Sequence, residues 1–245
     1  MNILILAGGF GTRMYPLTLN TPKALLEIKN KPVIEYLFEK INEIKNVEEI
    51  KGIYILSNNK FYINFLEWLN KFRNEEKILS EKIKIINNGV NDEMEKNGAI
   101  GDLKYAFEFI GNEEDIFVFA ADNLFEFNLN SMINLFYEKK SSVIALKIID
   151  DSDLIKKYSC VLQDESGKII FFEEKPESPQ SNICSVGCYY ITDGDIKKIQ
   201  NHEFSSRDNL GLMIEFLHKK SNIYGISFDE FWTDVSLEEL EKLNA

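Results

Sequence analysis

The stretch Leu6-Ala7-Gly8-Gly9-Phe10-Gly11-Thr12-Arg13, continued by Pro22-Lys23-Ala24-Leu25, decides the predicted fold of this chain. It follows the apolar run Ile3-Leu4-Ile5-Leu6, so we expect the glycines at the carboxyl end of a first strand, where open α/β sheets bind their ligands. Glycines let backbone N–H groups approach a phosphate chain, and Arg13 and Lys23 add positive charge. A glycine-rich turn that only connects two elements is the simpler alternative, which the two cations disfavour.

Length and charge limit the classes of function. With 245 residues, of which 44% are hydrophobic, the chain is long enough to bury a sizeable core. Its formal net charge of -12 argues against loose binding to nucleic acid or to an anionic membrane surface. No apolar run is long enough to cross a bilayer, and the N-terminus lacks the features of a signal peptide. We therefore expect a cytoplasmic protein that binds neither nucleic acid nor membrane.

The cysteines fit the same compartment. There are three of them, Cys160, Cys184 and Cys188, so they cannot all form pairs within the chain. Cys184 and Cys188 could share one side of a strand as metal ligands. Because the chain has only two histidines, we favour buried structural thiols instead.

Strand-like and helix-like segments alternate over the first 141 residues, which predicts a mostly parallel sheet covered by helices on both faces. The most apolar strand, Asp115–Ala121, is expected at the centre, and the polar segment Asn87–Asn97 is a candidate mobile loop over a ligand. After Ser142 the strands are expected to form an antiparallel addition to this core. Further expected elements are strands at Gly52–Ser57, Ile83–Ile86, Val143–Ile149, Tyr158–Gln163, Ile169–Glu174, Cys184–Ile191 and Ile223–Phe228, helices over Pro32–Ile44, Phe61–Phe72, Leu103–Ile110 and about Arg207–Leu217, and a last helix opened by a capping box of Ser236 and Glu239.

The glycine loop by itself fits several nucleotide-binding folds. A dinucleotide-binding fingerprint requires Gly-x-Gly-x-x-Gly at the start of a helix, whereas Met14 and several prolines and threonines follow Arg13 here. A Walker loop requires Gly-Lys-Ser/Thr, which this loop lacks. The loop is therefore expected to be a phosphate-binding loop of another type.

Seven short motifs in order along the chain resemble those of the sugar nucleotidyltransferases, also called nucleotide-sugar pyrophosphorylases, and in particular the glucose-1-phosphate thymidylyltransferase-like enzymes. The resemblance implies a Rossmann-like α/β fold of the GT-A-like type, with a mixed, mostly parallel sheet flanked by helices and an antiparallel sugar-binding addition. The motifs are Gly8-Gly9-x-Gly11-Thr12-Arg13, Pro16-x-Thr18, Pro22-Lys23-x-Leu25, Lys31-Pro32-x-Ile34, Ala121-Asp122-Asn123, Glu174-Lys175-Pro176 and Trp232-Thr233-Asp234-Val235.

The implied reaction joins an NTP to a sugar 1-phosphate to give an NDP-sugar and pyrophosphate, for polysaccharide or glycoconjugate synthesis. A phosphate monoester with a second pKa near ~6 is mostly ionised at neutral pH, so no general base is needed. Positioning and cations then provide the catalysis. By the resemblance the catalytic residues are Arg13, at the leaving pyrophosphate, Lys23 and Asp122, and the nucleotide-binding residues are Leu6, Ala7, Gly8, Gly9, Gly11, Thr12, Arg13, Lys23 and Gly98.

The remaining site residues also come from the resemblance. Asp122 and Asp234 would hold Mg²⁺, a hard ion that favours one or two carboxylates together with phosphate oxygens. Glu174, Lys175 and Gly187 would bind the acceptor, with Lys175 on its phosphate and Glu174 on sugar hydroxyls. Residues 1–245 would form a single domain, in which residues 1–141 are the nucleotide-binding core and residues 142–245 supply the acceptor part and one metal carboxylate. The resemblance is also compatible with a homo-oligomer.

Three departures from the family pattern bear on the substrate. Ala121 stands where the family usually has glycine, and Ser236, which we interpret as a helix cap, replaces another glycine. The loop expected to contact the base reads Asn97-Gly98-Ala99-Ile100-Gly101-Asp102. In it Gly98 keeps the close backbone approach, and Asp102 is either a helix N-terminal charge or a specificity element.

Two other functions remain open at this point. The first is a cytidylyltransferase of the same fold that acts on phosphocholine or another small phosphorylated alcohol, for which Tyr189, Tyr190 or Trp232 would form an aromatic cage. The second is a non-catalytic nucleotide-binding protein. That alternative predicts loss of Arg13, Lys23 or a metal carboxylate, and all of these are present.

Overall fold

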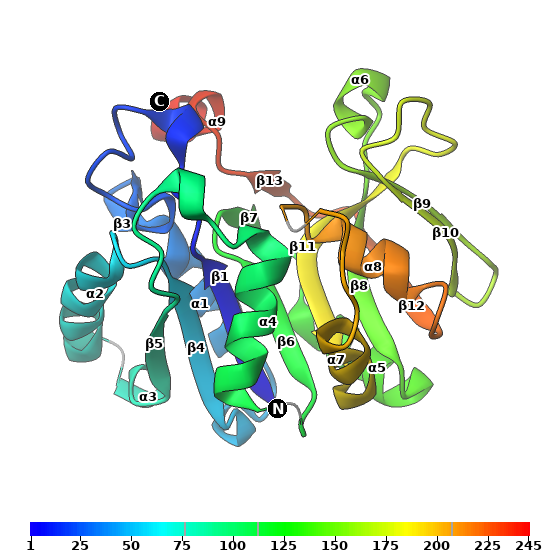
Figure 1. The fold of residues 1–245 in the computed structure, drawn as a ribbon, viewed down its shortest axis with the longest axis horizontal. Coiled ribbons are helices and arrows are strands. Elements are labelled where there is room, and N and C mark those ends of the chain that lie inside the picture. Colours follow the sequence, from blue (N-terminus) through cyan, green and yellow to red (C-terminus); the bar gives the residue numbers. More distant parts are fainter. Residues whose placement is uncertain (76, 112, 207) are drawn as a thin grey trace.

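The computed structural model describes residues 1–75, 77–111, 113–206 and 208–245. In these residues a seven-stranded sheet has the order β12-β8-β11-β6-β1-β4-β5 (Figure 1). Strand β11 is antiparallel to both of its neighbours, and all other neighbouring pairs are parallel, which confirms the predicted mixed, mostly parallel sheet. The strands are β1 Asn2–Ala7, β4 Gly52–Ser57, β5 Ile83–Asn87, β6 Ile116–Ala120, β8 Ser142–Ile148, β11 Ile183–Ile191 and β12 Ile223–Phe228.

Helices cover both faces of this sheet, as Figure 1 shows. Side chains of β1 alternate between two buried clusters, with Ile3 and Ile5 in one and Leu4 in the other, because successive residues of a strand point to opposite faces. Strand β6 is the central strand of the sheet, as predicted, and is buried on both faces. The helices on the Ile3 face are α1 Val33–Asn42, α2 Tyr62–Glu75 and α5 Leu129–Lys139, and those on the Leu4 face are α4 Gly98–Ile110, α7 Asp193–Gln200 and α8 Gly211–Leu217.

The strands after Ser142 do not all form the expected antiparallel addition. Strand β8 joins the central sheet, parallel to β12, because Val143-Ile144-Ala145-Leu146 is buried throughout and requires cover on both faces. The addition consists of the two-stranded antiparallel hairpin of β9 Ser159–Gln163 and β10 Ile169–Glu174. The predicted helix at about Arg207–Leu217 is α8, which begins at Gly211, and Arg207 lies outside the described residues.

Short helices and two-stranded pairings complete the fold. Helix α9 begins after Ser236, whose Oγ accepts a hydrogen bond from the Glu239 N–H at 3.2 Å, so the predicted cap is confirmed. The three cysteines are free and buried, as favoured above. None of the described helices is long and apolar enough to cross a membrane. The remaining elements are η1 Thr12–Met14, η2 Lys23–Leu25, β2 Glu27–Ile28, β3 Lys31–Pro32, η3 Val47–Glu49, α3 Lys77–Ser80, η4 Glu93–Glu95, β7 Asn123–Phe125, α6 Ser152–Ile155, β13 Trp232–Asp234 and α9 Leu237–Asn244.

Candidate active site

The glycine loop is held on one side and open on the other. The amide of Asn58, which directly follows β4, donates to the carbonyl of Gly8 at 3.0 Å. Gly11 has a φ of 64°, and its carbonyl accepts from the Thr18 hydroxyl at 2.7 Å. A Cβ on Gly9 would meet no atom within 4 Å. The hydrogen bonds from Asn58 and Thr18 therefore fix the loop backbone, and Gly9 borders open space for a ligand.

Two of the predicted catalytic residues are in direct contact. Lys23, the first residue of η2, places its Nζ 2.5 Å from Oδ2 of Asp122, which follows the central strand β6. Asn123 donates its side-chain amide to the other oxygen of Asp122 at 3.1 Å. Both partners of the Lys23–Asp122 pair remain partly exposed, so the pair can exchange its contacts with those of a ligand. Arg13, the other predicted catalytic residue, is exposed in η1, next to the open part of the glycine loop.

The two predicted metal carboxylates come together through a small second sheet. Strand β13 pairs with β7, which places Asp234 opposite Asn123, and the Val235 N–H donates to the Asp122 carbonyl at 2.7 Å. Asp122 and Asp234 consequently line one cavity of about 240 Å³. The hydroxyl of Tyr158 donates to Oδ1 of Asp234 at 2.6 Å. Burial and this bond to a carboxylate both raise the pKa of Tyr158, so the hydroxyl stays protonated and remains a donor.

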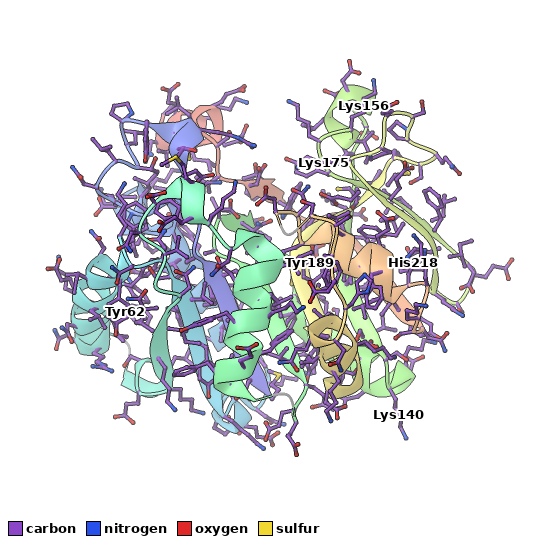
Figure 2. All side chains as sticks on the ribbon, in the orientation of Figure 1. Tyr62, Lys140, Lys156, Lys175, Tyr189 and His218 are labelled. Carbon is purple, nitrogen blue, oxygen red and sulfur yellow. The ribbon has the colours of Figure 1, made fainter. Side chains whose placement is uncertain are left out.

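Of the predicted acceptor residues, Glu174 and Gly187 line this cavity, whereas Lys175 is not among its lining residues. Glu174, at the end of β10, lines it, and burial raises the pKa of Glu174 to about 7 against the opposing effect of Lys175. Lys175 has a φ of 50°, donates its backbone N–H to the Tyr158 carbonyl and places its Nζ 2.9 Å from Oδ1 of Asn209. Figure 2 shows Lys175 just after the end of β10, away from the hairpin turn, and Tyr189 on β11, nearer the middle of the molecule.

Two glycines shape the acceptor side of the cavity. A Cβ on Gly187 would lie 2.8 Å from the Cβ of Ala120, so glycine lets β11 approach the end of β6. A Cβ on Gly211 would lie in the volume that the Glu174 carboxyl group occupies. Both glycines line the cavity, and Gly187 was among the predicted acceptor residues.

The charge of the cavity wall limits what it can bind. Among the described lining residues there are four carboxylates and one lysine, Lys157. An anionic phosphate placed against such a wall is repelled unless a cation accompanies it. Oδ2 of Asp234 accepts no hydrogen bond from the described residues, and hard carboxylate oxygens are the ligands that Mg²⁺ prefers. The residues present therefore fit a divalent cation shared by Asp122, Asp234 and phosphate oxygens.

The expected base-contacting loop lies beside the glycine loop. Helix α4 begins at Gly98, which is buried and has a φ of 73°. Asp102, one turn later, is 7% exposed, and its Oδ1 accepts amide N–H groups from Asn88 at 2.7 Å and from Asn97 at 3.3 Å. Burial raises the pKa of Asp102, and these two bonds act in the opposite direction.

Several residues that position the predicted site residues by hydrogen bonds were not predicted from the sequence. Asn58 and Tyr158 fix Gly8 and Asp234, and Asn209 binds Lys175. A signal existed only for Asn58, a polar residue placed directly after a buried strand. Of the three aromatic residues considered for a cage, Tyr189 and Trp232 line the cavity. Tyr190 does not belong to such a cage, because it is fully buried between Phe117 and Phe136 in the core.

The sequence pattern of one protein family, the nucleotidyl transferases, matches residues 2–242. The chain belongs to the nucleotidyl transferase family. The match includes the glycine loop and the residues predicted to bind metal and acceptor.

Individual relatives agree with this assignment. The chain is 27% identical over 238 residues to the bifunctional protein GlmU of Methanococcus aeolicus, covering 96% of this chain and 51% of that protein. It is 28% identical over 239 residues to the mannose-1-phosphate guanylyltransferase catalytic subunit beta of Danio rerio, covering 96% of this chain and 61% of that protein. The chain thus spans about half to three-fifths of these relatives.

Solved structures share the fold. A UDP-glucose pyrophosphorylase in complex with UDP-glucose superposes with a TM-score of 0.82 at 22% identity, covering 99% of this chain and 96% of that one. A UDP-glucose pyrophosphorylase from Acinetobacter baumannii gives a TM-score of 0.76 at 18% identity, covering 99% and 91%. At these identities the likeness shows the fold alone.

Proposed function

We propose that this chain transfers a nucleotidyl group from an NTP to a sugar 1-phosphate, releasing pyrophosphate. One observation carries the proposal: the β7–β13 pair brings Asp122 and Asp234 to a single cavity that Glu174 also lines, while Lys23 contacts Asp122. This arrangement fits the joining of two phosphate-bearing substrates better than the binding of one nucleotide. The names of the relatives, which include a mannose-1-phosphate guanylyltransferase, support it.

In the proposed reaction an ionised oxygen of the acceptor phosphate forms a bond to the α-phosphorus of the nucleotide. The bond from that phosphorus to the bridging oxygen breaks, and pyrophosphate leaves with the electron pair. The nucleophile is already deprotonated, so the protein has to position it and to stabilise negative charge. We assign the triphosphate to the backbone of the Gly8–Gly11 loop, the leaving pyrophosphate to Arg13 and the base to the vicinity of Gly98.

The acceptor is assigned to the cavity between β10, β11 and α8. Lys175, held by Asn209, would pair with the acceptor phosphate, and Glu174 would accept hydrogen bonds from hydroxyl groups. Mg²⁺ on Asp122 and Asp234 would neutralise charge on the phosphate oxygens. Lys23 would exchange its 2.5 Å contact with Asp122 for the phosphates when the nucleotide enters.

The test is a matrix of NTPs against sugar 1-phosphates and against phosphocholine, with release of pyrophosphate as the readout. We expect turnover with at least one sugar 1-phosphate in the presence of Mg²⁺, and loss of most of it in Asp122→Ala and in Arg13→Ala. Asp193→Ala and Arg73→Ala are matched controls, because Asp193 forms an ion pair with Lys197 within α7 and Arg73 is exposed at the end of α2. Undiminished turnover in Asp122→Ala and Arg13→Ala would contradict the assignment.

A further inference from the structure

The side-chain amide of Asn123 lies between Trp232 and Asp122 and forms a hydrogen bond with each. The indole N–H of Trp232 donates to Oδ1 of Asn123 at 2.6 Å, and Nδ2 of Asn123 donates to Oδ1 of Asp122 at 3.1 Å. The second oxygen of Asp122, Oδ2, lies 2.5 Å from Nζ of Lys23. Side chains from three separate segments of the chain are thus joined in one series of polar contacts that ends at the predicted metal site.

The pairing of β7 with β13 brings the indole to this place. In the antiparallel register Asp234 stands opposite Asn123, and Trp232 stands opposite Phe125. Residues directly opposite each other share a face of the sheet, and so do residues two apart on one strand. Trp232 is therefore the diagonal neighbour of Asn123, on the face that also carries Asp234. The pairing that brings the second metal carboxylate to the site also brings the indole N–H to Asn123.

The two partners of the Asn123 amide allow it only one orientation. An indole N–H can only donate a hydrogen bond, and an ionised carboxylate can only accept one. A reversed amide would place its oxygen against Oδ1 of Asp122 and its N–H groups against the N–H of Trp232, so it would lose both bonds. On a further side β11 approaches closely, because a Cβ on Gly187 would lie 3.3 Å from Nδ2 of Asn123. The amide is therefore fixed in both position and orientation.

This arrangement leaves Oδ2 as the oxygen of Asp122 that can meet a cation. Oδ1 accepts the Asn123 amide, whereas Oδ2 contacts the ammonium group of Lys23. Hydrogen bonds that orient a metal ligand in advance raise the affinity of a site, because less order has to be gained when the metal binds.

Packing alone does not account for the indole. The ring of Trp232 lies edge-on to Tyr158 at a centroid distance of 5.2 Å and lines the cavity, and a phenylalanine ring could do both. Only the N–H group bonds to Asn123. Resting on the metal site of the function proposed above, we propose that Trp232 is a positioning residue of that site, which acts through Asn123 and holds Asp122 with Oδ2 toward the cation.

The first experiment measures binding of Mn²⁺ alone, a cation that suits the same carboxylate ligands as Mg²⁺, by electron paramagnetic resonance of the free ion. We expect the dissociation constant to rise about tenfold in Asn123→Ala, as for loss of a group that orients a metal ligand. Trp232→Phe keeps the ring and should raise it by about fivefold, the factor that corresponds to one neutral hydrogen bond. With alanine at position 123, Trp232→Phe should cause no further change, because the two residues act in series.

The other tryptophan of the chain provides a matched control. The indole N–H of Trp68 donates to Glu35 at 2.8 Å, and neither residue lines the cavity, so Trp68→Phe should leave the Mn²⁺ dissociation constant unchanged. The two indole N–H signals can also be followed by NMR during a Mg²⁺ titration, with each signal assigned from its Trp→Phe variant. We expect the Trp232 signal to move, because a cation on Asp122 changes the polarisation of the whole series of bonds, and the Trp68 signal to stay. In Asn123→Ala the Trp232 signal should lose most of this movement.

Three results would overturn the proposal. The first is an unchanged Mn²⁺ dissociation constant in Trp232→Phe, including the case in which only KM for the acceptor rises. The second is an effect of Trp232→Phe that is equally large with alanine at position 123. The third is a Trp232 signal that ignores Mg²⁺ or moves fully without Asn123. Thermal melting of each variant keeps loss of folding from being mistaken for loss of affinity.

Metal binding does not require turnover, and this separates the two proposals. A chain that binds Mn²⁺ with the expected dependence on Trp232 and Asn123, but releases no pyrophosphate with any pair of substrates, contradicts the proposed function and leaves the role of Trp232 standing. A chain that releases pyrophosphate, and whose Trp232→Phe variant binds Mn²⁺ like the wild type, does the reverse.

Discussion

Replacing Tyr158 with phenylalanine tests the metal side of the site with the loss of one oxygen atom. The ring stays in place, edge-on to Trp232 at a centroid distance of 5.2 Å, while Asp234 loses the donor that lies 2.6 Å from its Oδ1. A hydrogen bond to a charged group contributes about 1.5–3 kcal/mol. Loss of a group that orients a metal ligand typically lowers metal affinity about 10–100-fold. These two magnitudes agree, because each factor of ten corresponds to about 1.4 kcal/mol.

The assay is pyrophosphate release as a function of Mg²⁺ concentration, at saturating nucleotide and acceptor. We expect the Mg²⁺ concentration that gives half the maximal rate to rise by at least about tenfold in Tyr158→Phe. The maximal rate itself should stay near that of the wild type, because both carboxylates remain. Tyr36→Phe is the matched control: it removes a hydroxyl that donates at 2.7 Å to the Ile28 carbonyl, a bond that no cavity residue shares.

Two results would refute this reasoning. An unchanged Mg²⁺ requirement with a lower maximal rate would mean that the Tyr158 hydroxyl contacts a substrate rather than positioning Asp234. A lower Mg²⁺ requirement would mean that the hydroxyl competes with the metal for the carboxylate. Equal effects in Tyr36→Phe would point to a general loss of structure.

Burial raises the pKa of Glu174 to about 7, so its carboxylate forms as the pH rises through that value. We expect kcat/KM for the acceptor to rise over the same pH range. In Glu174→Gln the pH dependence of kcat/KM should reflect only the titration of the substrate phosphate. Gly211→Ala displaces the Glu174 carboxyl group and should raise KM for the acceptor without changing nucleotide affinity, whereas Gly194→Ala, with its nearest neighbouring atom 3.9 Å away, should change neither. Ser236→Ala removes the cap of α9 and should lower the free energy of unfolding by about 1 kcal/mol in a denaturant titration, with catalysis unaffected.

The sequence predicts the strands of this fold better than it predicts their order. The central strand β6 and residues 3–7 of its neighbour β1 are apolar without interruption, as burial on both faces requires, and both strands were predicted. The same property holds for β8, but the pattern along one strand does not identify its partners, so its place in the central sheet was missed. Helices α5 and α7 were not predicted, although Thr192, which accepts a bond from the Asp195 N–H, is a cap signal for α7.

For the site, the sequence supplied candidates and the structure supplied their contacts. Asp122 and Asp234 could be proposed because each stands at a fixed place in an ordered motif. The bond from Tyr158 to Asp234 depends on how the β9–β10 hairpin sits over β13, and the fit of Glu174 against Gly211 depends on how α8 packs on β10. These contacts join segments that lie far apart along the chain, so no local pattern in the sequence encodes them.

The electrostatics of the cavity also give a physical reason for the Lys23–Asp122 pair. Among the described lining residues, Asp122, Asp208 and Asp234 are aspartates and Glu174 has a pKa raised to about 7, so without counterions the cavity wall repels the phosphate groups that the proposed reaction requires. Lys23 is held at 2.5 Å from one of these carboxylates, where it lowers the negative charge of the wall. A cation arriving with the nucleotide can take over Asp122 and free Lys23 for the phosphates. The pair thus keeps a positive charge at the site that the phosphate groups enter. An uncharged residue at position 23 would neither lower the negative charge of the empty cavity nor bind the phosphates of the nucleotide.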